Sequence, residues 1–407
     1  MVMKIAIFTD IYAPWGDGGI PSSIKAQKNE LERLGHEIVL FCPGYNAREK
    51  GVVNVPSHEH VEINGAIISK RPKKVEQFVL ERFPNFADEF DLVHVHYEAS
   101  CSLAGVHLAR RFGMPLVQTM HGREDRAIEV NTPKLVRGFV ARWLNKHHGN
   151  YLVHELRVKR DKFQAPTKLR ARMWTLMVNH AEQADVVVVP SQHFGDKLEH
   201  YGVTKPIVVV SNGIDENLVK QKFHVRELED GDVLKMIWNS RISREKRMME
   251  FLAALRMLKR PYLLYAYGNG NDFKKAQKFV KKHSLKVKFY GPTTRQKIID
   301  RMSESHLAVM ASYNFDTQGM TLLEAEATGL PVFFCDPTME EVVPQGSYVI
   351  SGGPEPEAMA MALESLPPNR IADMSRIMLE HRSEVMSDVQ VEKMLAAYSL
   401  ALSKRPV

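Results

Sequence analysis

The chain has 407 residues, of which 44% are hydrophobic and 25% charged, and its formal net charge is +7. This length corresponds to about two or three domains, and the composition excludes a disordered, collagen-like or low-complexity chain. Three widely spaced cysteines argue against a disulfide scaffold, and no apolar run reaches the roughly 18 residues of a membrane span, so a cytoplasmic location is expected.

Short runs rich in valine and isoleucine alternate with longer helical patterns along the first half of the chain. This alternation is typical of parallel strands covered by helices on both faces, and it predicts an α/β fold. Two of the predicted helices span residues 20–34 and 100–111. The predicted strands are Lys4–Phe8, Glu37–Cys42, Leu92–His96, Leu116–Met120, Asp185–Pro190 and Ile207–Val210.

A charged stretch without strand periodicity, residues 219–232, precedes a second series of strands. It predicts domains at residues 1–218 and 219–385, with a C-terminal helix at 386–407 that returns to brace the first domain. Two doubly wound sheets facing each other are expected to leave a cleft at the carboxyl ends of their strands. The second series of strands is Leu234–Ser240, Tyr262–Tyr267, Val287–Tyr290, Leu307–Met310, Val332–Cys335 and Tyr348–Ile350.

A glycine after one of these strands opens a predicted helix. The free amides of Gly319, Met320 and Thr321 at this helix start predict an anion site for a phosphate group. Asp316 and Glu324 flank the site, and carboxylates in such places accept hydrogen bonds from sugar or ribose hydroxyl groups. The alternative is that Asp316 caps the helix and that Glu324 is solvated.

Two basic residues follow the predicted strand Leu234–Ser240. Arg241 lies at its carboxyl end, and Lys246 comes five positions later, where another helix is expected to start. Both side chains can neutralise a diphosphate, the guanidinium group by a fork and the ammonium group as a point charge. The alternative is a solvated charged turn.

Two adjacent glycines, Gly18 and Gly19, precede the first predicted helix. Glycine at this turn allows a ligand to approach the backbone closely. The turn lacks the G-x-G-x-x-G pattern of dinucleotide-binding proteins, so a nicotinamide-dependent enzyme is disfavoured.

His121 follows a predicted strand and is expected to hold a sugar hydroxyl group or to polarise the reacting centre. The alternative is a structural histidine. His94 and His96 lie on one face of a strand, which suggests a metal, but no further ligands complete such a site. We therefore expect no metal.

In their order and spacing, these motifs resemble the family 4 retaining glycosyltransferases of the two-domain, Rossmann-like GT-B architecture. The family's acidic motif is E-x7-E, whereas this chain has Asp316 in the first position and Glu324 in the second. Further matching segments are Asp91–His96, Gln118–Gly122, Val189–Ser191, Ser211–Asp215 and Gly329–Val332.

The resemblance implies a role for each candidate residue and requires neither a cofactor nor a metal. Glu324 would hold the donor ribose, and Asp316 with the amides around Gly319 would hold the donor sugar. Arg241 and Lys246 would hold the diphosphate. His121 would contact a sugar hydroxyl group at the reaction centre, and the Gly18–Gly19 turn would approach the donor phosphates or the acceptor.

The resemblance further implies an enzyme that moves a hexose, glucose or galactose, from a nucleotide diphosphate sugar, with UDP favoured, to a lipid or cell-envelope acceptor with retention. The sequence is similar to the branch that glucosylates or galactosylates diacylglycerol and related polyprenyl or glycan acceptors. Alternatives are a soluble sugar or protein acceptor, and a catalytically silent scaffold of the same fold.

Residues 134–172 hold eleven lysines and arginines against only Glu155 and Asp161. Apolar residues from Leu135 to Leu144 recur at helical spacing and predict one amphipathic stripe, which would place the protein peripherally on the inner face of an anionic membrane. The alternative is that the stripe packs on the first sheet. A nucleic-acid partner is disfavoured because no recognised binding motif accompanies the charge.

Overall fold

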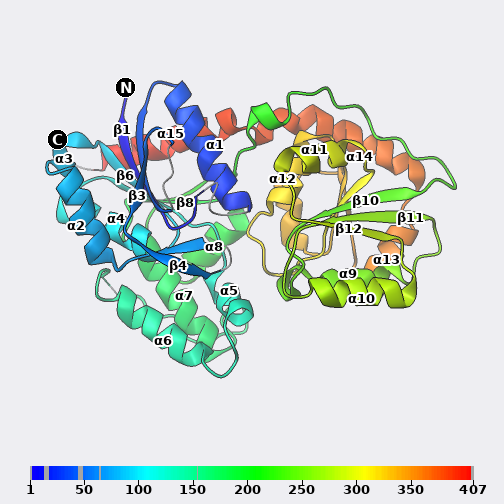
Figure 1. Ribbon diagram of the computed structural model, residues 1–407, viewed down its shortest axis with the longest axis horizontal. Coiled ribbons are helices and arrows are strands. Elements are labelled where there is room, and N and C mark those ends of the chain that lie inside the picture. Colours follow the sequence, from blue (N-terminus) through cyan, green and yellow to red (C-terminus); the bar gives the residue numbers. More distant parts are fainter. Residues whose placement is uncertain (1, 13–17, 45–48, 64–65, 154, 405–407) are drawn as a thin grey trace. The chain divides into compact units, whose positions relative to one another are not determined.

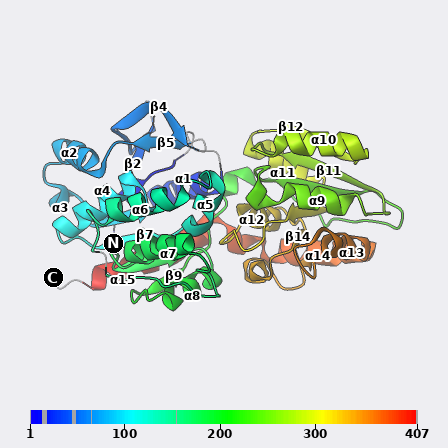
Figure 2. The same ribbon diagram turned by 90° about the horizontal axis from the view of Figure 1, so that it is seen from below.

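The computed structural model describes residues 2–404 except 13–17, 45–48, 64–65 and 154. The chain divides into two compact units, each described by itself: unit 1 is Met1–Asn212 with Gln390–Val407, and unit 2 is Gly213–Val389. Each combines a sheet with helices (Figures 1 and 2). Among the helices described, none is both long and apolar enough to cross a membrane.

Unit 1 contains a seven-stranded sheet in the order β3-β2-β1-β6-β7-β8-β9, in which every neighbouring pair is parallel. Side chains of its first strand alternate between the two faces, so that Ile5 and Ile7 join one core and Ala6 and Phe8 the other. The strands are β1 (Lys4–Thr9), β2 (Glu37–Pro43), β3 (Val52–Val55), β6 (Leu92–His96), β7 (Leu116–Thr119), β8 (Val186–Val189) and β9 (Ile207–Val209).

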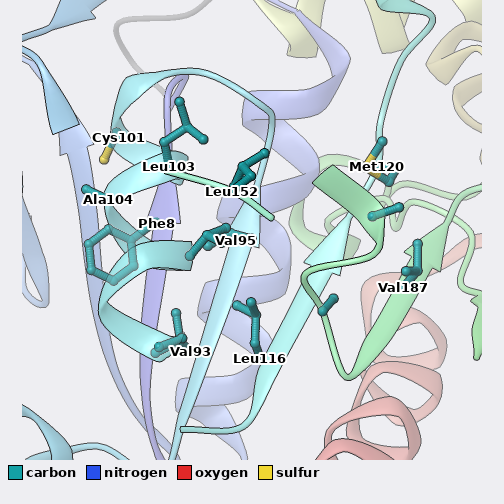
Figure 3. Packing of buried hydrophobic residues seen from close by; sticks show 14 of the residues in the cluster. Phe8, Val93, Val95, Cys101, Leu103, Ala104, Leu116, Met120, Leu152 and Val187 are labelled. Atoms are coloured by element: carbon teal, nitrogen blue, oxygen red, sulfur yellow. The ribbon is translucent and has the colours of Figure 1, made fainter. Parts of the chain in front are cut away.

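Helices cover both faces of this sheet. On one face Phe8, Val93 and Val95 pack beside Leu103 and Ala104 of the fourth helix (Figure 3). On the other face, α1 and the C-terminal helix α15 share a core with the strands. The helices of unit 1 are α1 (Gly19–Arg33), α2 (Pro72–Arg82), α3 (Phe86–Glu89), α4 (Ser100–Arg111), α5 (Glu124–Asn131), α6 (Arg137–His148), α7 (Lys168–Ala181), α8 (Gln192–His200) and α15 (Ser387–Ser403).

Three strands were not predicted. The edge strand β3 has only four residues, and β4 (Ser57–Ile63) with β5 (Ala66–Ser69) forms a separate antiparallel pair. Strands β3 (VVNV) and β4 (SHEHVEI) contain polar residues and therefore lack the continuous apolar run that marks a buried parallel strand.

Unit 2 contains a six-stranded parallel sheet in the order β12-β11-β10-β13-β14-β15. This is the strand order of a doubly wound fold, so the predicted pair of doubly wound α/β sheets is confirmed. The strands are β10 (Leu234–Asn239), β11 (Tyr262–Tyr267), β12 (Val287–Gly291), β13 (Leu307–Met310), β14 (Val332–Phe334) and β15 (Tyr348–Ile350).

The helices of unit 2 also pack on both faces. One core includes Phe251 of α9, Ala276 of α10 and Ile371 of α14. The other includes Ile299 of α11 and Leu322 of α12. The helices are α9 (Met248–Leu255), α10 (Phe273–His283), α11 (Arg295–Ser303), α12 (Met320–Ala327), α13 (Pro356–Glu364) and α14 (Pro368–His381).

Each sheet has one point where the strand order reverses: between β1 and β6 in unit 1, and between β10 and β13 in unit 2. Loops leave the sheet in opposite directions at such a switch point, which opens a crevice where doubly wound proteins bind ligands. The candidate residues are therefore expected at these two places.

Candidate functional site

The switch point of unit 2 gathers side chains from the ends of β10 and β13. Asn239 ends β10, and Ser312 and Asp316 lie in the loop after β13. Thr321, at the start of α12, donates a hydrogen bond from Oγ1 to the carbonyl oxygen of Asn239 at 2.8 Å. This bond ties the start of α12 to the end of β10.

Glu324 lies on the buried face of α12 and is only 3% exposed. Asn239 Nδ2 donates to its Oε2 at 2.6 Å, and Arg295 forms an ion pair with its Oε1. The alternative of a solvated Glu324 is therefore wrong. A carboxylate has about four acceptor positions, so these two donors leave room for hydroxyl groups of a ligand.

Asp316 does not act as a simple helix cap. Its Oδ1 lies 2.5 Å from Lys246 Nζ, and Ser312 Oγ donates to its Oδ2. Burial by itself would raise the pKa of Asp316, but Lys246 and the hydrogen bonds outweigh it and hold the pKa below its ordinary value. Asp316 is thus a stable anion bound to a cation.

The chain around Arg241 differs from the prediction in one respect. A 3-10 turn, η2 (Arg244–Lys246), comes first, and the helix α9 begins only at Met248 because Arg247 adopts a left-handed φ of 62°. Arg241 is half-exposed and forms an ion pair with Glu245 at 2.9 Å. The interpretation as a purely solvated turn therefore fits neither basic residue, since Lys246 also has a carboxylate partner.

Gly319 precedes α12 with a φ of 80°, a conformation that favours glycine. A Cβ atom there would lie 2.6 Å from Met310 Sδ. Gly319 is the N-cap of α12 and Met320 and Thr321 are its first two residues, so their amides stand at a tightly packed helix start, as the sequence predicts.

In unit 1, His121 follows β7 and is buried. Its Nε2 lies 2.8 Å from Nδ1 of His96, which ends β6. Burial lowers the pKa of His121 to about 3 and that of His96 well below its ordinary value, so both rings are neutral near pH 7. One of the two rings must therefore donate an N–H hydrogen bond to the other, so His121 and His96 form a hydrogen-bonded pair. Its role toward a sugar hydroxyl group stays a prediction.

His94 has no metal-like environment. Its Nδ1 lies 2.8 Å from Tyr398 Oη of α15 and its Nε2 lies 2.7 Å from Thr119 Oγ1. Across the described ranges of the chain, no group of three or more His, Cys, Asp or Glu residues is arranged to hold a metal ion. Both ring nitrogens are already used inside the core.

Gly18 and Gly19 stand where α1 begins, and Gly18 has a φ of 142°. The preceding part of the turn, residues 13–17, lies outside the described residues. A side chain at Gly18 would be strained by this backbone conformation, which is the reason for glycine at this turn.

The predicted stripe on residues 135–144 is not a single face. Helix α6 begins at Arg137, and its Val140 and Leu144 pack in a small core with α5 and α7. Phe139 and Trp143 are instead 65% and 54% exposed. We call the exposed set the α6 patch; it comprises Leu135, Phe139 and Trp143 with the exposed basic residues Lys134, Arg142 and Lys146.

Three polar residues of the unit 2 site escaped sequence reasoning: Asn239, Arg295 and Ser312. Asn239 and Ser312 could have been found, since both stand at or just after the carboxyl end of a predicted strand. Arg295 begins a helix far along the chain and carries no such signal. Together the site offers two carboxylates, several cations and a helix start, which suits a ligand with both hydroxyl groups and phosphates.

Comparisons with known proteins show which families and folds the chain is similar to. Residues 17–218 match the model of Glycosyltransferase Family 4, and residues 219–378 match that of Glycosyl transferases group 1. An alpha-monoglucosyldiacylglycerol synthase of Streptococcus pneumoniae is 25% identical over 81% of this chain and 70% of its own length. One of the same name from Acholeplasma laidlawii is 25% identical over 81% and 79%.

Solved structures show the same fold. Sucrose-phosphate synthase from Thermosynechococcus elongatus aligns with a TM-score of 0.73 at 15% identity, covering 99% of this chain and 100% of that one. HepE from Anabaena, in complex with UDP, aligns with a TM-score of 0.67 at 14% identity, covering 98% and 100%.

Proposed function

Because the chain belongs to the family 4 glycosyltransferases, we propose that it transfers a hexose from a nucleotide diphosphate sugar to diacylglycerol or a related lipid, with retention of configuration. The observation that carries the proposal is the pairing of Asp316 with Lys246 beside the helix start that follows Gly319. The names of the two relatives support a glucosyl donor and a diacylglycerol acceptor. UDP as the nucleotide is supported by the UDP-bound Anabaena neighbour.

In this proposal, unit 2 binds the donor. Glu324 accepts hydrogen bonds from the ribose hydroxyl groups at the acceptor positions that Asn239 and Arg295 leave open. Asp316 and the amides around Gly319 hold the sugar. Lys246 and Arg241 neutralise the diphosphate as it leaves, which stabilises the transition state electrostatically.

The bond from the sugar C1 atom to the diphosphate oxygen breaks as the acceptor oxygen bonds to C1 on the same face. The hydroxyl proton of the acceptor passes to the departing phosphate oxygen, so charge and atoms balance. This path needs no carboxylate nucleophile on the protein.

Unit 1 binds the acceptor and brings the protein to the lipid surface through the α6 patch. Exposed aromatic side chains beside basic ones suit the headgroup layer of an anionic membrane, where the rings insert and the cations meet lipid phosphates. The protein would then act on the cytoplasmic face of the membrane.

The test is a transfer assay with purified protein, a panel of nucleotide sugars and diacylglycerol in mixed vesicles. We expect UDP-glucose or UDP-galactose to give an α-linked glycolipid, identified by the anomeric coupling in its NMR spectrum, and turnover to survive EDTA. Transfer only to soluble sugars would replace the lipid acceptor, and absence of both transfer and donor hydrolysis would indicate a silent scaffold.

A further inference from the structure

The switch point of unit 1 holds a carboxyl group, that of Glu98, which takes no part in the proposed mechanism. Strand β6 ends at His96, the chain reverses at Tyr97 with a φ of 82°, and Glu98 follows before α4 begins. Gln118 of β7 donates from Nε2 to the carbonyl oxygen of Tyr97 at 3.0 Å. This bond fixes the turn that carries Glu98.

Asp10, directly after β1, holds the other side of the turn. Its Oδ1 accepts from the amide of Cys101 at 2.7 Å, and its Oδ2 accepts from the amide of Ala99 at 3.1 Å and from Ser102 Oγ at 2.7 Å. The turn that carries Glu98 is therefore fixed by residues at the ends of both strands next to β6, which are β1 and β7.

The side chain of Glu98 is buried without the partners that burial normally requires. It is 6% exposed, and among the described residues its Oε1 meets no hydrogen-bond partner. The same holds for Nε2 of His96, whose ring is 1% exposed. A buried polar atom without a hydrogen bond destabilises the fold, so two of them at a switch point indicate a place where a ligand supplies the missing bonds.

The charges around Glu98 indicate what kind of ligand fits. Burial raises the pKa of Glu98 well above its ordinary range, and the nearby carboxylates of Glu124 and Asp10 raise it further. Burial also raises the pKa of Glu124 to about 7. A neutral carboxyl group both donates and accepts hydrogen bonds, as does a neutral imidazole, and a hydroxyl group complements both.

We propose that Glu98, on the turn between β6 and α4, binds and orients the hydroxyl group of the acceptor. This inference rests on the proposed function, in which unit 1 binds the acceptor. In diacylglycerol this hydroxyl group is the one that receives the hexose. Its proton passes to the departing phosphate oxygen, so Glu98 orients the group and takes no proton from it.

The test compares binding of two probes: a water-soluble, short-chain diacylglycerol and its O-acetylated derivative, which lacks the hydroxyl group. Glu98→Gln keeps one donor and one acceptor, as the neutral carboxyl group does, whereas Glu98→Met fills similar space without either. Glu199→Gln, on the exposed surface of α8, is the matched control. Calorimetry gives the dissociation constants, and thermal unfolding without ligand checks that each variant is folded.

We expect the wild-type protein, Glu98→Gln and Glu199→Gln to prefer the hydroxyl-bearing probe. Glu98→Met should bind that probe about tenfold more weakly and the acetylated probe equally well. Glu98→Ala replaces the methionine variant if the latter does not fold.

The inference would be overturned if the wild-type protein and Glu98→Met bound the hydroxyl-bearing probe equally well. So would a wild-type protein without preference for the hydroxyl group. Transfer to diacylglycerol is measured separately: its absence refutes the proposed function, while the binding preference alone decides the role of Glu98.

Discussion

Lys246 Nζ lies 2.5 Å from Asp316 Oδ1, so the cation assigned to the donor diphosphate also holds the acid assigned to the donor sugar. The two assignments therefore predict coupled effects. Lys246→Ala should lower kcat/KM about 100-fold or more, because it removes a counter-ion of the leaving group and releases Asp316. Asp316→Asn should cost less in the Lys246→Ala background than alone, and a double-mutant cycle measures the difference.

Lys274→Ala, on the exposed face of α10, is the control for that cycle and should leave kcat/KM unchanged. If the losses of kcat/KM in Lys246→Ala and Asp316→Asn simply add in the double variant, the ion pair has no part in turnover.

Glu324→Gln should weaken donor binding and transfer by roughly 1.5 to 3 kcal/mol, as expected for a buried carboxylate that accepts several hydrogen bonds. The amide also loses the ion pair with Arg295. Steady-state kinetics with varied donor measures the loss, and Glu357→Gln on the exposed surface of α13 should match the wild-type protein. Wild-type kinetics for Glu324→Gln would remove Glu324 from the donor site.

Asp316→Glu restores the acid usual at this position in the family and moves the carboxylate by about one bond length. Because Lys246 and Ser312 both hold Asp316, this shift should change the ratio of kcat/KM between UDP-glucose and UDP-galactose. The ratio is read from competition assays, and an unchanged ratio would mean that Asp316 does not select the sugar.

The α6 patch predicts salt-sensitive binding to anionic vesicles. Replacing Lys134, Arg142 and Lys146 with Gln should weaken binding in low salt, because each basic residue near an anionic surface contributes about 1 kcal/mol. Replacing Phe139 and Trp143 with Ser should weaken it at every salt concentration. Co-sedimentation with anionic and neutral vesicles measures both, and a wild-type protein that ignores anionic vesicles in low salt would refute the membrane contact.

Buried neutral histidines make unit 1 sensitive to acid. Burial lowers the pKa of His94, His121 and His180 to about 3, against an ordinary value near 6.5. Between these values the unfolded chain binds protons that the folded chain excludes, so the free energy of unfolding should fall as pH drops below about 6.5, by up to about 1.4 kcal/mol per pH unit for each ring. Urea titrations at pH 7.5 and 5.5 test this; equal stability at both would contradict it.

The fold was predictable because buried parallel strands carry continuous apolar runs. Val186–Val189 and Leu307–Met310 are buried throughout and stand out in the sequence. The edge strand β3 has the same length, but Asn54 interrupts its apolar run and only every second residue is buried, so the sequence did not predict it.

Candidate site residues could be predicted where they lie shortly after a strand, as Arg241 and His121 do, or at a helix start, as Gly319 does. Arg295 instead reaches Glu324 only because α11 packs near α12, which no local pattern reveals. The sequence also did not predict the break at Arg247 between the 3-10 turn η2 and helix α9, because the left-handed conformation of an arginine depends on tertiary packing.

Unit 1 is discontinuous in sequence: residues 390–407 belong to it, although all of unit 2 lies between them and Asn212. Tyr398 from this segment is fully buried and bonded to His94. During synthesis, unit 2 therefore has its whole sequence available before unit 1 does, and one face of the unit 1 sheet is covered only in part, by α1, until α15 emerges. The part that begins first on the ribosome is completed last.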